Sequence, residues 1–452
     1  MNVRKNAASL STLEWERLLG AIITLKHTFA AGSTVSIYDQ FVAIHLGVTA
    51  LTGAQTVDGA HGGPAFLPWH CEYLKRMEQA LQSVDPRVSI PYWNWGLGGD
   101  AETVPLFQDA RMGPMGSGGA NGNQVMSGYF AQAPNAFNPL GWTIHTALRP
   151  FPGAALQRNS SLDTSTAWPD PNWPGPWSSA TAITTILAQP TFNLFRPALE
   201  WPPHGIVHVR MGRHMTAMTS PNDPIFFLHH AQVDRLWARW QQTHPGSVNY
   251  NPLGTGGTGH QLMDDIWPWD AGASQTTAAV GTLLPSYPST DTVKPVDVLD
   301  HRALGYCYDD EPNCPCPDAA VIPPQPGAIH GEAAPGLDIP DNVPQGVVSN
   351  IQIAQAGSLA DITVGVDITH TYRGDLRVTL VAPSGVTAEL QSPMNDPTPN
   401  LQRTFGPVSS PDLANFVQGQ ISIQGQWTLH VSDNFSRDVG RLNSWSLDLS
   451  AS

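Results

Sequence analysis

Two histidines at the ends of a stiff apolar segment, His61 and His70 in HGGPAFLPWH, are the first residues of this sequence that could bind a metal. No charged residue lies between them, and the prolines of the segment favour a fixed separation of the two imidazoles. His45 precedes them and shares a helical face with Phe41 and Val48. We therefore treat His45, His61 and His70 as one candidate set of ligands.

A second set of histidines occurs further along the chain. His204 and His208 are four residues apart, a spacing that places both imidazoles on one face of a helix, where they can bind one ion. An isolated pair of this kind is more often incidental, but His230 supplies a third imidazole. His230 lies on one helical stripe with Phe226, whereas the adjacent His229 lies about 100° round the helix.

The chemistry of these two sets favours a pair of copper ions. Separate buried imidazoles would each require a hydrogen-bond partner, and a shared metal centre removes that requirement. Neutral imidazoles without thiolate or carboxylate suit copper, which heads the divalent affinity series. Zinc is the alternative, because zinc with three histidines forms hydrolytic sites. Two cuprous ions could each give one electron to dioxygen, which makes O2 the expected co-substrate.

Helices are predicted to position most of these histidines. The predicted helices are one that begins after Ser11 and three that cover residues 38–48, 70–82 and 223–242. Ser11 with Glu14 forms a capping-box pattern at the first of them. Prolines at the start and Gly212 at the end predict a further short helix through His204 and His208. Residues 96–190 are rich in Gly, Pro, Asn and Trp, and we expect loops with short helices there.

A change of pattern along the chain predicts three parts. Residues 1–310 are expected to form a mainly α domain, and the Pro-rich residues 311–335 a semi-rigid linker. Residues 336–452 contain runs of alternating apolar residues, such as ADITVGVDITH and GQWTLHVSD. This period of two, interrupted by turn residues, predicts an all-β antiparallel sandwich.

Composition excludes several classes of protein. Of the 452 residues 41% are apolar and 13% are charged, which is enough apolar surface for large cores. The net charge of −15 and the lack of a Lys/Arg run exclude nucleic acid as an expected partner. No apolar run approaches the ~18 residues of a membrane span. The N-terminal residues carry no signal-peptide pattern.

Four cysteines are too few for a disulfide-dense scaffold. Cys314 and Cys316 lie in the expected linker, where two thiolates could transfer Cu(I) to the site. The alternative, which we favour, is a disulfide from one of them to Cys307 or to Cys71.

The motifs around both histidine sets closely resemble those of the type-3 copper family, which comprises tyrosinases, catechol oxidases and haemocyanins. The resemblance covers roughly residues 10–310 and is most specific in the pattern Asp-Pro-x-Phe-Phe-x-x-His-x-x-x-Asp, from Asp223 to Asp234. It implies a helix bundle with long loops that holds two copper ions. The implied ligands are His45, His61 and His70 for one copper and His204, His208 and His230 for the other.

The resemblance also implies roles for residues around the metals. Glu200 would hold a water near the second copper and help to deprotonate a phenol, with a solvated surface glutamate as the alternative. Phe226 or Phe227 would form a wall of the substrate pocket, and of the two we choose Phe227. Asp234 would orient a ligand or pair with an arginine, and a helix-surface ion pair is the alternative. Gly205 stands where tyrosinases with strong monophenol activity often have Asn.

The Tyr-x-Tyr motif that closes this domain in the family is matched in LGYCYDD by Tyr306 and Tyr308. The implied function is oxidation of small o-diphenols to o-quinones with O2, with ortho-hydroxylation of monophenols as a candidate second activity. Two alternatives stay open. One is a haemocyanin-like oxygen carrier, and the other is an o-aminophenol oxidase.

The last part of the chain resembles the P (Homo B) domain of proprotein convertases, a jelly-roll type of β-sandwich, with Gly374 and Asp375 in the most recognisable motif. No Ser-His-Asp protease precedes it. We expect this domain to contact the catalytic domain in cis, where it would stabilise it or cover the copper pocket. An independent binding module is the alternative. Such a tail favours export by a route without a cleavable signal over a cytoplasmic location.

Overall fold

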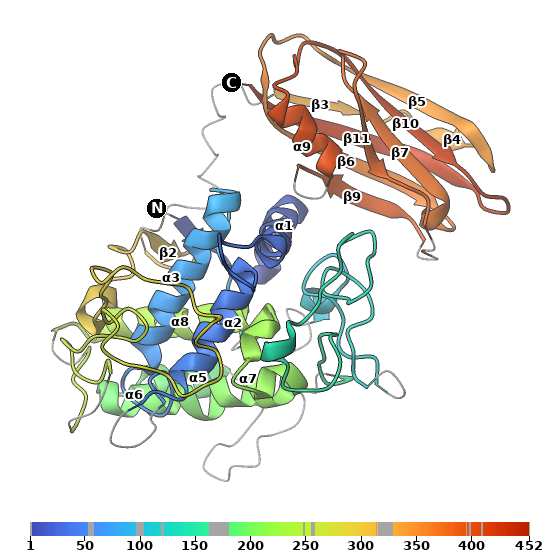
Figure 1. Cartoon of the computed structure of the whole chain (residues 1–452). Coiled ribbons are helices and arrows are strands. Elements are labelled where there is room, and N and C mark those ends of the chain that lie inside the picture. The colour runs from blue at the N-terminus through green and yellow to red at the C-terminus, as the bar shows by residue number, and fades with distance from the viewer. Residues whose placement is uncertain are drawn as a thin grey trace. The chain divides into compact units, whose positions relative to one another are not determined.

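The computed structural model describes residues 2–52, 58–95, 104–118, 122–161, 180–246, 249–254, 258–312, 314, 329–394, 396, 399–407 and 410–451. The chain divides into two compact units, residues 1–10 with 21–317 and residues 11–20 with 318–452. Helices predominate up to residue 312 and strands from residue 329 onward (Figure 1). None of the described helices is long and apolar enough to cross a membrane.

The predicted helices are all present. Among the described residues before 312, the α-helices are α1 (Thr12–His27), α2 (Ile37–Val48), α3 (Phe66–Val84), α5 (Ala180–Leu187), α6 (Phe192–Leu199), α7 (Gly205–Met211) and α8 (Ile225–Thr243). The capping box of α1 is confirmed, because Glu14 Oε2 accepts the Ser11 N–H at 2.8 Å and Ser11 Oγ accepts the Glu14 N–H at 3.3 Å. α3 begins earlier than predicted, at Phe66.

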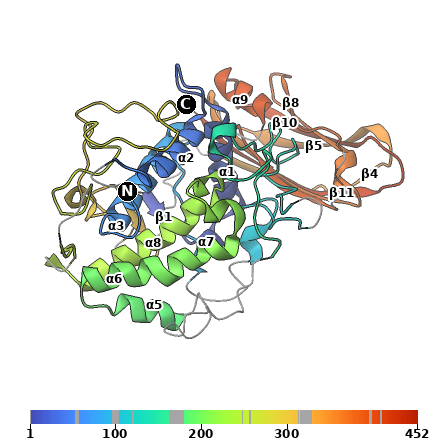
Figure 2. The same cartoon turned by 60° about the horizontal axis from the view of Figure 1, so that its bottom comes forward.

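Helix α6 was not predicted, whereas α5 is one of the short helices expected within residues 96–190. Both have eight residues, α5 contains β-branched residues that lower helix propensity, and α6 contains Pro197. Figure 2 shows both with α7 and α8 in the green part of the chain. The described part of 96–190 before α5 forms loops with the short turns η3 (Val104–Phe107) and η5 (Thr146–Leu148), as expected. Residues 96–103, 119–121 and 162–179 lie outside the described residues.

The start of α8 is tied to the long loops by a buried ion pair. Arg158 donates to both carboxylate oxygens of Asp223, at 2.7 and 2.8 Å, and neither side chain is exposed to solvent. Asp223 Oδ1 also accepts the Ile225 N–H at 3.1 Å and so caps the helix. The pair therefore fixes where α8, the helix of His230, begins.

A second buried polar cluster joins distant parts of the helical unit. Strand β1 (Asn2–Arg4) pairs in parallel with β2 (Tyr306–Tyr308). Asp234 accepts from the hydroxyls of Tyr306 (2.7 Å) and Tyr308 (2.5 Å) and from Arg4 Nη1 (3.1 Å). Asp234 thus pairs with an arginine, as one of the alternatives predicted. The alternative of a helix-surface ion pair is wrong, because the Asp234 side chain is only 5% exposed.

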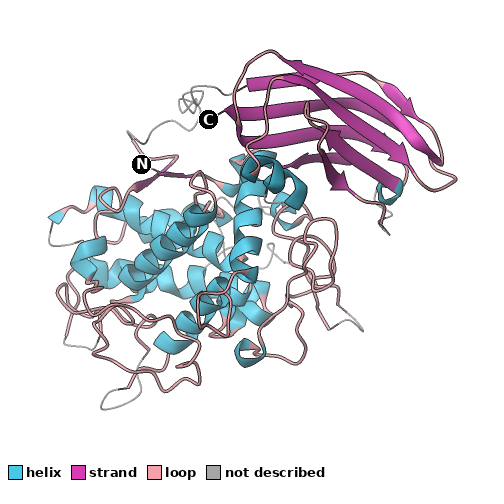
Figure 3. Ribbon diagram, turned by 45° about the horizontal axis from the view of Figure 1, so that its top comes forward, coloured by secondary structure: helices cyan, strands magenta, loops and turns pink. Residues whose placement is uncertain are grey.

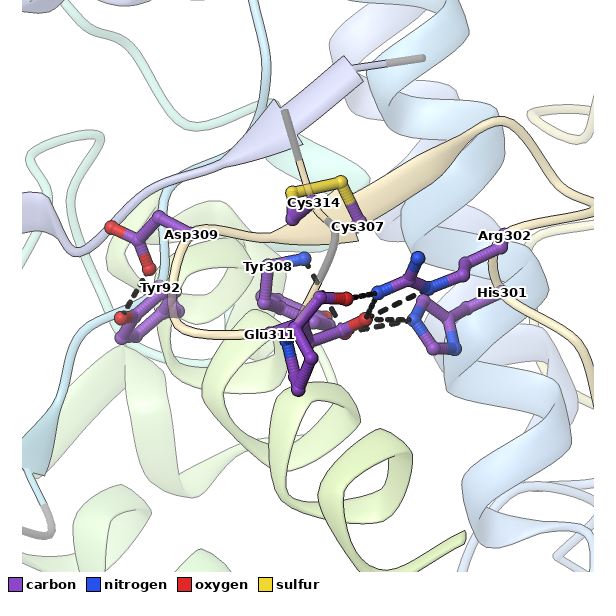
Figure 4. Close-up of a disulfide and its surroundings, with 9 residues drawn as sticks. Tyr92, His301, Arg302, Cys307, Tyr308, Asp309, Glu311 and Cys314 are labelled. Atoms are coloured by element: carbon purple, nitrogen blue, oxygen red, sulfur yellow. Dashed lines mark hydrogen bonds and ion pairs between the residues drawn. A yellow bond between two sulfur atoms is a disulfide. The ribbon is translucent and has the colours of Figure 1, made fainter. Parts of the chain in front are cut away.

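The end of β2 is closed by a disulfide between Cys307 and Cys314, which confirms the pairing favoured from the sequence for Cys314 (Figure 4). Nearby, Glu311 accepts hydrogen bonds from Arg302 and from the Tyr308 N–H and lies within hydrogen-bond distance of His301. Cys71 is buried and unbridged, and Cys316 lies outside the described residues. Because Cys314 is bridged, it is not available as part of a Cu(I)-transferring dithiol.

Removing this disulfide is expected to destabilise the chain modestly. The two cysteines are seven residues apart, and a loop of that size predicts a loss of about 2 kcal/mol for Cys307→Ala. Urea unfolding under oxidising conditions measures the difference. In the presence of a reductant, the wild type and the variant should unfold at nearly the same urea concentration. Equal stability under oxidising conditions would contradict the expectation.

Strands make up the last part of the chain (Figure 3). They are β3 (Ile329–Ala333), β4 (Leu337–Ile339), β5 (Val343–Ile353), β6 (Leu359–His370), β7 (Leu376–Val381), β8 (Thr387–Gln391), β9 (Leu401–Phe405), β10 (Gly425–Asp433) and β11 (Gly440–Ala451), with helix α9 (Pro411–Gln418). One sheet has the order β5–β10–β7–β8 and the other β3–β11–β6–β9, with β4 paired to β11. All these pairs are antiparallel, as the alternating pattern predicted.

The predicted linker, residues 311–335, extends too far toward the C-terminus, because its last part contains a strand. Ile329–Ala333 forms β3, which pairs with β11 although its own sequence shows no clear alternation. Residues 313 and 315–328 lie outside the described residues. The two sheets share one apolar core that includes Trp427 and Trp445, and Trp445 Nε1 donates to Ser349 Oγ on the other sheet at 2.9 Å.

The motif residue Gly374 lies in a short turn between β6 and β7. A Cβ at this position would lie 2.2 Å from the Met394 carbonyl oxygen, so the close approach of two backbone segments requires glycine here. The following Asp375 is 8% exposed, and its backbone carbonyl accepts the Asn434 N–H at 3.0 Å. Both residues therefore hold turns of the sandwich in place.

Candidate metal centre

The first set of histidines converges from two helices and a loop. His45 comes from α2, His70 from α3 and His61 from the loop before α3. One ligand atom of each lies within 4.8 Å of those of the other two. The ring centroids of His45 and His61 are 5.2 Å apart, and those of His61 and His70 are also 5.2 Å apart. Three imidazoles thus face one small volume.

The second set converges in the same way. His204, at the end of the kinked segment Glu200–His204, and His208 of α7 meet His230 of α8, with His229 beside them. Ligand atoms of these four residues lie within 4.8 Å of one another. His208 Nε2 and His230 Nε2 are 3.4 Å apart, a spacing suited to two ligands of one ion.

The two sets are adjacent. The rings of His70 and His230 stack at a centroid distance of 4.2 Å, and those of His61 and His204 are 6.4 Å apart. The contact between α3 and α8 brings the first pair together, and Figure 1 shows both helices. Histidines from distant points of the chain therefore form one centre, as the sequence predicted. Their assignment as individual ligands stays a prediction.

Hydrogen bonds at Nδ1 orient most of these rings. Four of the Nδ1 atoms face backbone carbonyls: His45 faces Met218 (2.7 Å), His70 faces Phe66 (2.8 Å), His204 faces Glu200 (3.1 Å) and His208 faces Met215 (2.6 Å). A carbonyl oxygen can only accept, so Nδ1 carries the proton in each ring. The lone pair of each neutral ring then lies on Nε2, which is the tautomer that a metal site requires.

Burial keeps these imidazoles neutral. Burial, together with the neighbouring His61, lowers the pKa of His45 to about 3, and burial lowers the pKa of His208 to about 4. The pKa values of His70, His204 and His230 are also lowered by burial. Nε2 of His45, His70 and His204 is buried without a hydrogen-bond partner in the described chain. Unprotonated, unpartnered nitrogens in two adjacent groups fit two copper ions.

The structure distinguishes His230 from its neighbour His229. Trp95 Nε1 donates to His229 Nδ1 at 3.0 Å. Because an indole N–H is only a donor, His229 Nδ1 must accept, and neutral His229 then carries its proton on Nε2. Nε2 of His229 is buried without a hydrogen-bond partner in the described chain, but in this tautomer it carries the proton and has no lone pair for a metal. This agrees with the helical stripe, which points His230 rather than His229 into the centre.

Two phenylalanines line the centre. Phe226 stacks on His230 at 4.1 Å and lies edge-on to His45 at 5.0 Å. Phe66 contacts rings of both sets, at 5.0 Å from His70 and 4.8 Å from His204.

The predicted wall residue Phe227 lies elsewhere. Its ring is 5.8 Å from that of Tyr73 and 6.0 Å from that of Tyr38, and it is 2% exposed in the core behind the centre. The prediction is corrected in favour of Phe226, which lies four residues, about one helical turn, before His230 and so on its face of α8. Phe227 lies about 100° away around the helix.

Glu200 and Gly205 both lie near the second set of histidines. Each has a neighbour that the sequence did not predict. Glu200 forms an ion pair with Arg196 and accepts the Gly62 N–H at 2.6 Å. Its side chain is 12% exposed, so a solvated surface glutamate is wrong. Gly205 begins α7 with ordinary helical angles, φ −60° and ψ −32°. A Cβ there would meet the Trp201 ring at 2.1 Å, so the indole occupies the space of a side chain at 205.

Several residues of the site were not predicted. Asp58, which contacts His61, lies three residues before it and could have been found by spacing. Phe66 lies four residues before His70 and could have been found from the helical face. The carbonyls of Met215 and Met218 carry no side-chain signal, and only the folded backbone places them.

A helical domain whose core holds two adjacent sets of three histidines defines a type-3 copper oxidoreductase with a dinuclear copper site. The common central domain of tyrosinase matches residues 35–243, and the proprotein convertase P-domain matches residues 359–449. The chain is 32% identical over 342 residues to grixazone synthase of Streptomyces griseus, which covers 68% of this chain and 99% of that protein. It is 34% identical over 329 residues to a tyrosinase of Streptomyces glaucescens, which covers 69% of this chain and 100% of that protein.

The chain belongs to the tyrosinase family and carries a proprotein convertase P-domain after the tyrosinase domain. Among solved structures, that of a mutant polyphenol oxidase from Thermothelomyces thermophila is similar, with a TM-score of 0.47 and 22% identity. That similarity covers 68% of this chain and 88% of the other.

Proposed function

We propose that this chain oxidises small o-diphenols to o-quinones with O2. When bound, the two coppers supply the electron transfer between the phenol and dioxygen. The protein holds the imidazoles in their metal-binding tautomer, excludes water with Phe66 and Phe226, and limits which ring can enter. The observation that carries the proposal is a partly open centre, because the side chain of His61 is 21% exposed while His230 is fully buried.

Exposed apolar side chains belong to residues that are next to residues of the centre in sequence or contact them through the backbone. Trp201, which directly follows Glu200, is 50% exposed, and Val209, which directly follows His208, is 47% exposed. Met218 is 49% exposed, and its backbone carbonyl faces His45. Exposed apolar side chains next to a polar centre suit a flat aromatic substrate with adjacent hydroxyl groups. They favour a phenol oxidase over an oxygen carrier, whose pocket would be closed to phenols.

A substrate panel tests the proposal directly. Copper-loaded full-length chain is given catechol, tyramine, tyrosine and o-aminophenol, and quinone or quinone-imine formation is followed by absorbance. The proposal predicts turnover of catechol. Reversible oxygen binding without turnover of any of the four would instead support the haemocyanin-like alternative. Turnover of o-aminophenol in preference to catechol would support an aminophenol oxidase.

Monophenol hydroxylation is expected to be weak because residue 205 is Gly and not Asn, and the Trp201 ring occupies the space that an Asn side chain would need. We predict that Gly205→Asn destabilises the helical domain by about 1–3 kcal/mol, because the new side chain collides with the indole. Combining it with Trp201→Ala removes the collision. The ratio of tyramine to catechol turnover should then rise in the double variant and stay unchanged in Trp201→Ala. A raised ratio in Gly205→Asn without any loss of stability would contradict this explanation.

The P-domain is proposed to cover or stabilise the copper domain in cis. The support is its presence in the same chain, downstream of the Pro-rich residues 311–335. A protease site inserted among residues 315–328 allows the two parts to be separated after folding. A rise in catechol turnover after cleavage would support latency, and a fall in thermal stability without a rise would support stabilisation. Unchanged turnover and stability would contradict both.

A further inference from the structure

His61 is the one predicted ligand that does not lie on a helix or at a helix start. Its position therefore depends on contacts between its loop and other parts of the chain. His45, His70, His208 and His230 lie within α2, α3, α7 and α8, and His204 directly precedes α7. Gly62, next to His61, has a positive φ of 69°, which an ordinary residue rarely adopts. Backbone geometry alone therefore does not rigidify this ligand as a helix would.

One carboxylate holds the loop from within. Asp58 Oδ1 accepts the backbone N–H groups of Ala60 and His61, both at 2.9 Å. The other oxygen lies 3.0 Å from His61 Nδ1. Asp58 therefore fixes the shape of the turn and the orientation of the imidazole ring, but it belongs to the same loop. It cannot determine where that loop lies relative to the second histidine set.

A second carboxylate joins the loop to that set. Glu200 Oε1 accepts the Gly62 N–H at 2.6 Å, and its other oxygen pairs with Arg196 of α6. The carbonyl of the same Glu200 faces His204 Nδ1 at 3.1 Å. One residue thus contacts a ligand of the second set through its backbone and the neighbour of a ligand of the first set through its side chain.

We propose that Glu200 is a positioning residue that sets the separation of the two copper sites. The short charge-assisted bond to Gly62 anchors the His61 loop, and Arg196 keeps the carboxylate pointing toward it. The length of the side chain is what matters, because the acceptor has to reach from the segment of His204 to the loop of His61. This role is distinct from deprotonating a phenol, and it does not depend on which phenol is oxidised.

Two variants separate the positioning role from a role of the negative charge. Glu200→Gln keeps the length and an oxygen that can accept the Gly62 N–H, but it removes the charge. Glu200→Asp keeps the charge but withdraws the carboxylate by one methylene, out of reach of Gly62. Asp265→Asn is the matched control, since Asp265 forms an ion pair with Lys294 and is not in contact with any of the six histidines.

The readouts are copper retention against a chelator and the Cu(II) EPR signal of the oxidised, copper-loaded full-length chain. Two cupric ions held close together couple magnetically and give no signal, whereas uncoupled ions do. Glu200→Asp is expected to lose copper about tenfold or more faster and to show an EPR signal. Glu200→Gln and Asp265→Asn are expected to stay close to the silent wild type.

The proposal would be overturned if the two Glu200 variants ranked in the opposite order in copper retention and EPR signal. If Glu200→Asp stays EPR-silent with normal copper retention, the reach of the side chain does not set the copper pair. If Glu200→Gln loses the coupling while Glu200→Asp keeps it, the charge and not the hydrogen bond to Gly62 is responsible. Neither readout uses a phenol, so failure of this proposal is distinguishable from failure of the proposed diphenol oxidation.

Discussion

Replacing His230 with alanine is expected to lower the copper content of the loaded chain from two ions to about one and to abolish catechol oxidation. His230 Nε2 lies 3.4 Å from His208 Nε2, so its removal leaves the second site with two of its three ligands. The neighbouring His229 provides the matched control. His229→Gln should retain two coppers, because its Nδ1 accepts from Trp95 and the amide oxygen of Gln can take over that bond.

Metal analysis after removal of loosely bound copper measures both variants, and circular dichroism verifies that each is folded. Loss of one copper in His229→Gln with retention of both in His230→Ala would reverse the assignment of the third ligand. Loss in both variants would mean that the second copper is held by four imidazoles, as the mutual distances of His204, His208, His229 and His230 allow. The tautomer argument predicts a clear difference between these adjacent residues.

The second large effect is expected at the Arg158–Asp223 pair. Arg158→Met should destabilise the helical domain by about 3–5 kcal/mol, because it leaves the Asp223 carboxylate buried without its partner. Asp223 also caps α8, so the variant should lower copper occupancy of the second set as well.

The control is Arg441→Met, which removes an exposed ion pair with Asp338 in the β part of the chain. Exposed pairs of this kind contribute about 0–1 kcal/mol. Urea unfolding followed by tryptophan fluorescence compares the two variants with the wild type. A similar, small effect of both substitutions would show that the buried pair contributes no more than a surface one.

Local patterns predicted the helices and strands with the strongest periodicity. The helical stripe through Phe226 and His230 identified α8 and the inward-facing histidine, and alternation identified β6 and β10. The wall residue was inferred from the resemblance instead, and the choice of Phe227 was wrong because Phe226 is the residue that shares the face of His230 on α8. β3 carried too weak a pattern of its own and forms through its pairing with β11.

Contacts between distant residues could not be predicted from the sequence. Arg4 reaches Asp234 and Arg158 reaches Asp223 across 230 and 65 residues, and no local pattern links such pairs. Glu200 was assigned a role from resemblance, but its bond to Gly62 spans 138 residues and appears only in the fold. The carbonyls that orient the imidazoles are likewise set by the backbone and not by side-chain type.

The central claim is that six histidines hold two adjacent copper ions. Anomalous scattering at the copper edge from crystals of the copper-loaded chain tests it most directly. We expect two peaks of similar height, one among His45, His61 and His70 and the other among His204, His208 and His230. A single peak, or peaks outside these two groups of imidazoles, would contradict the account.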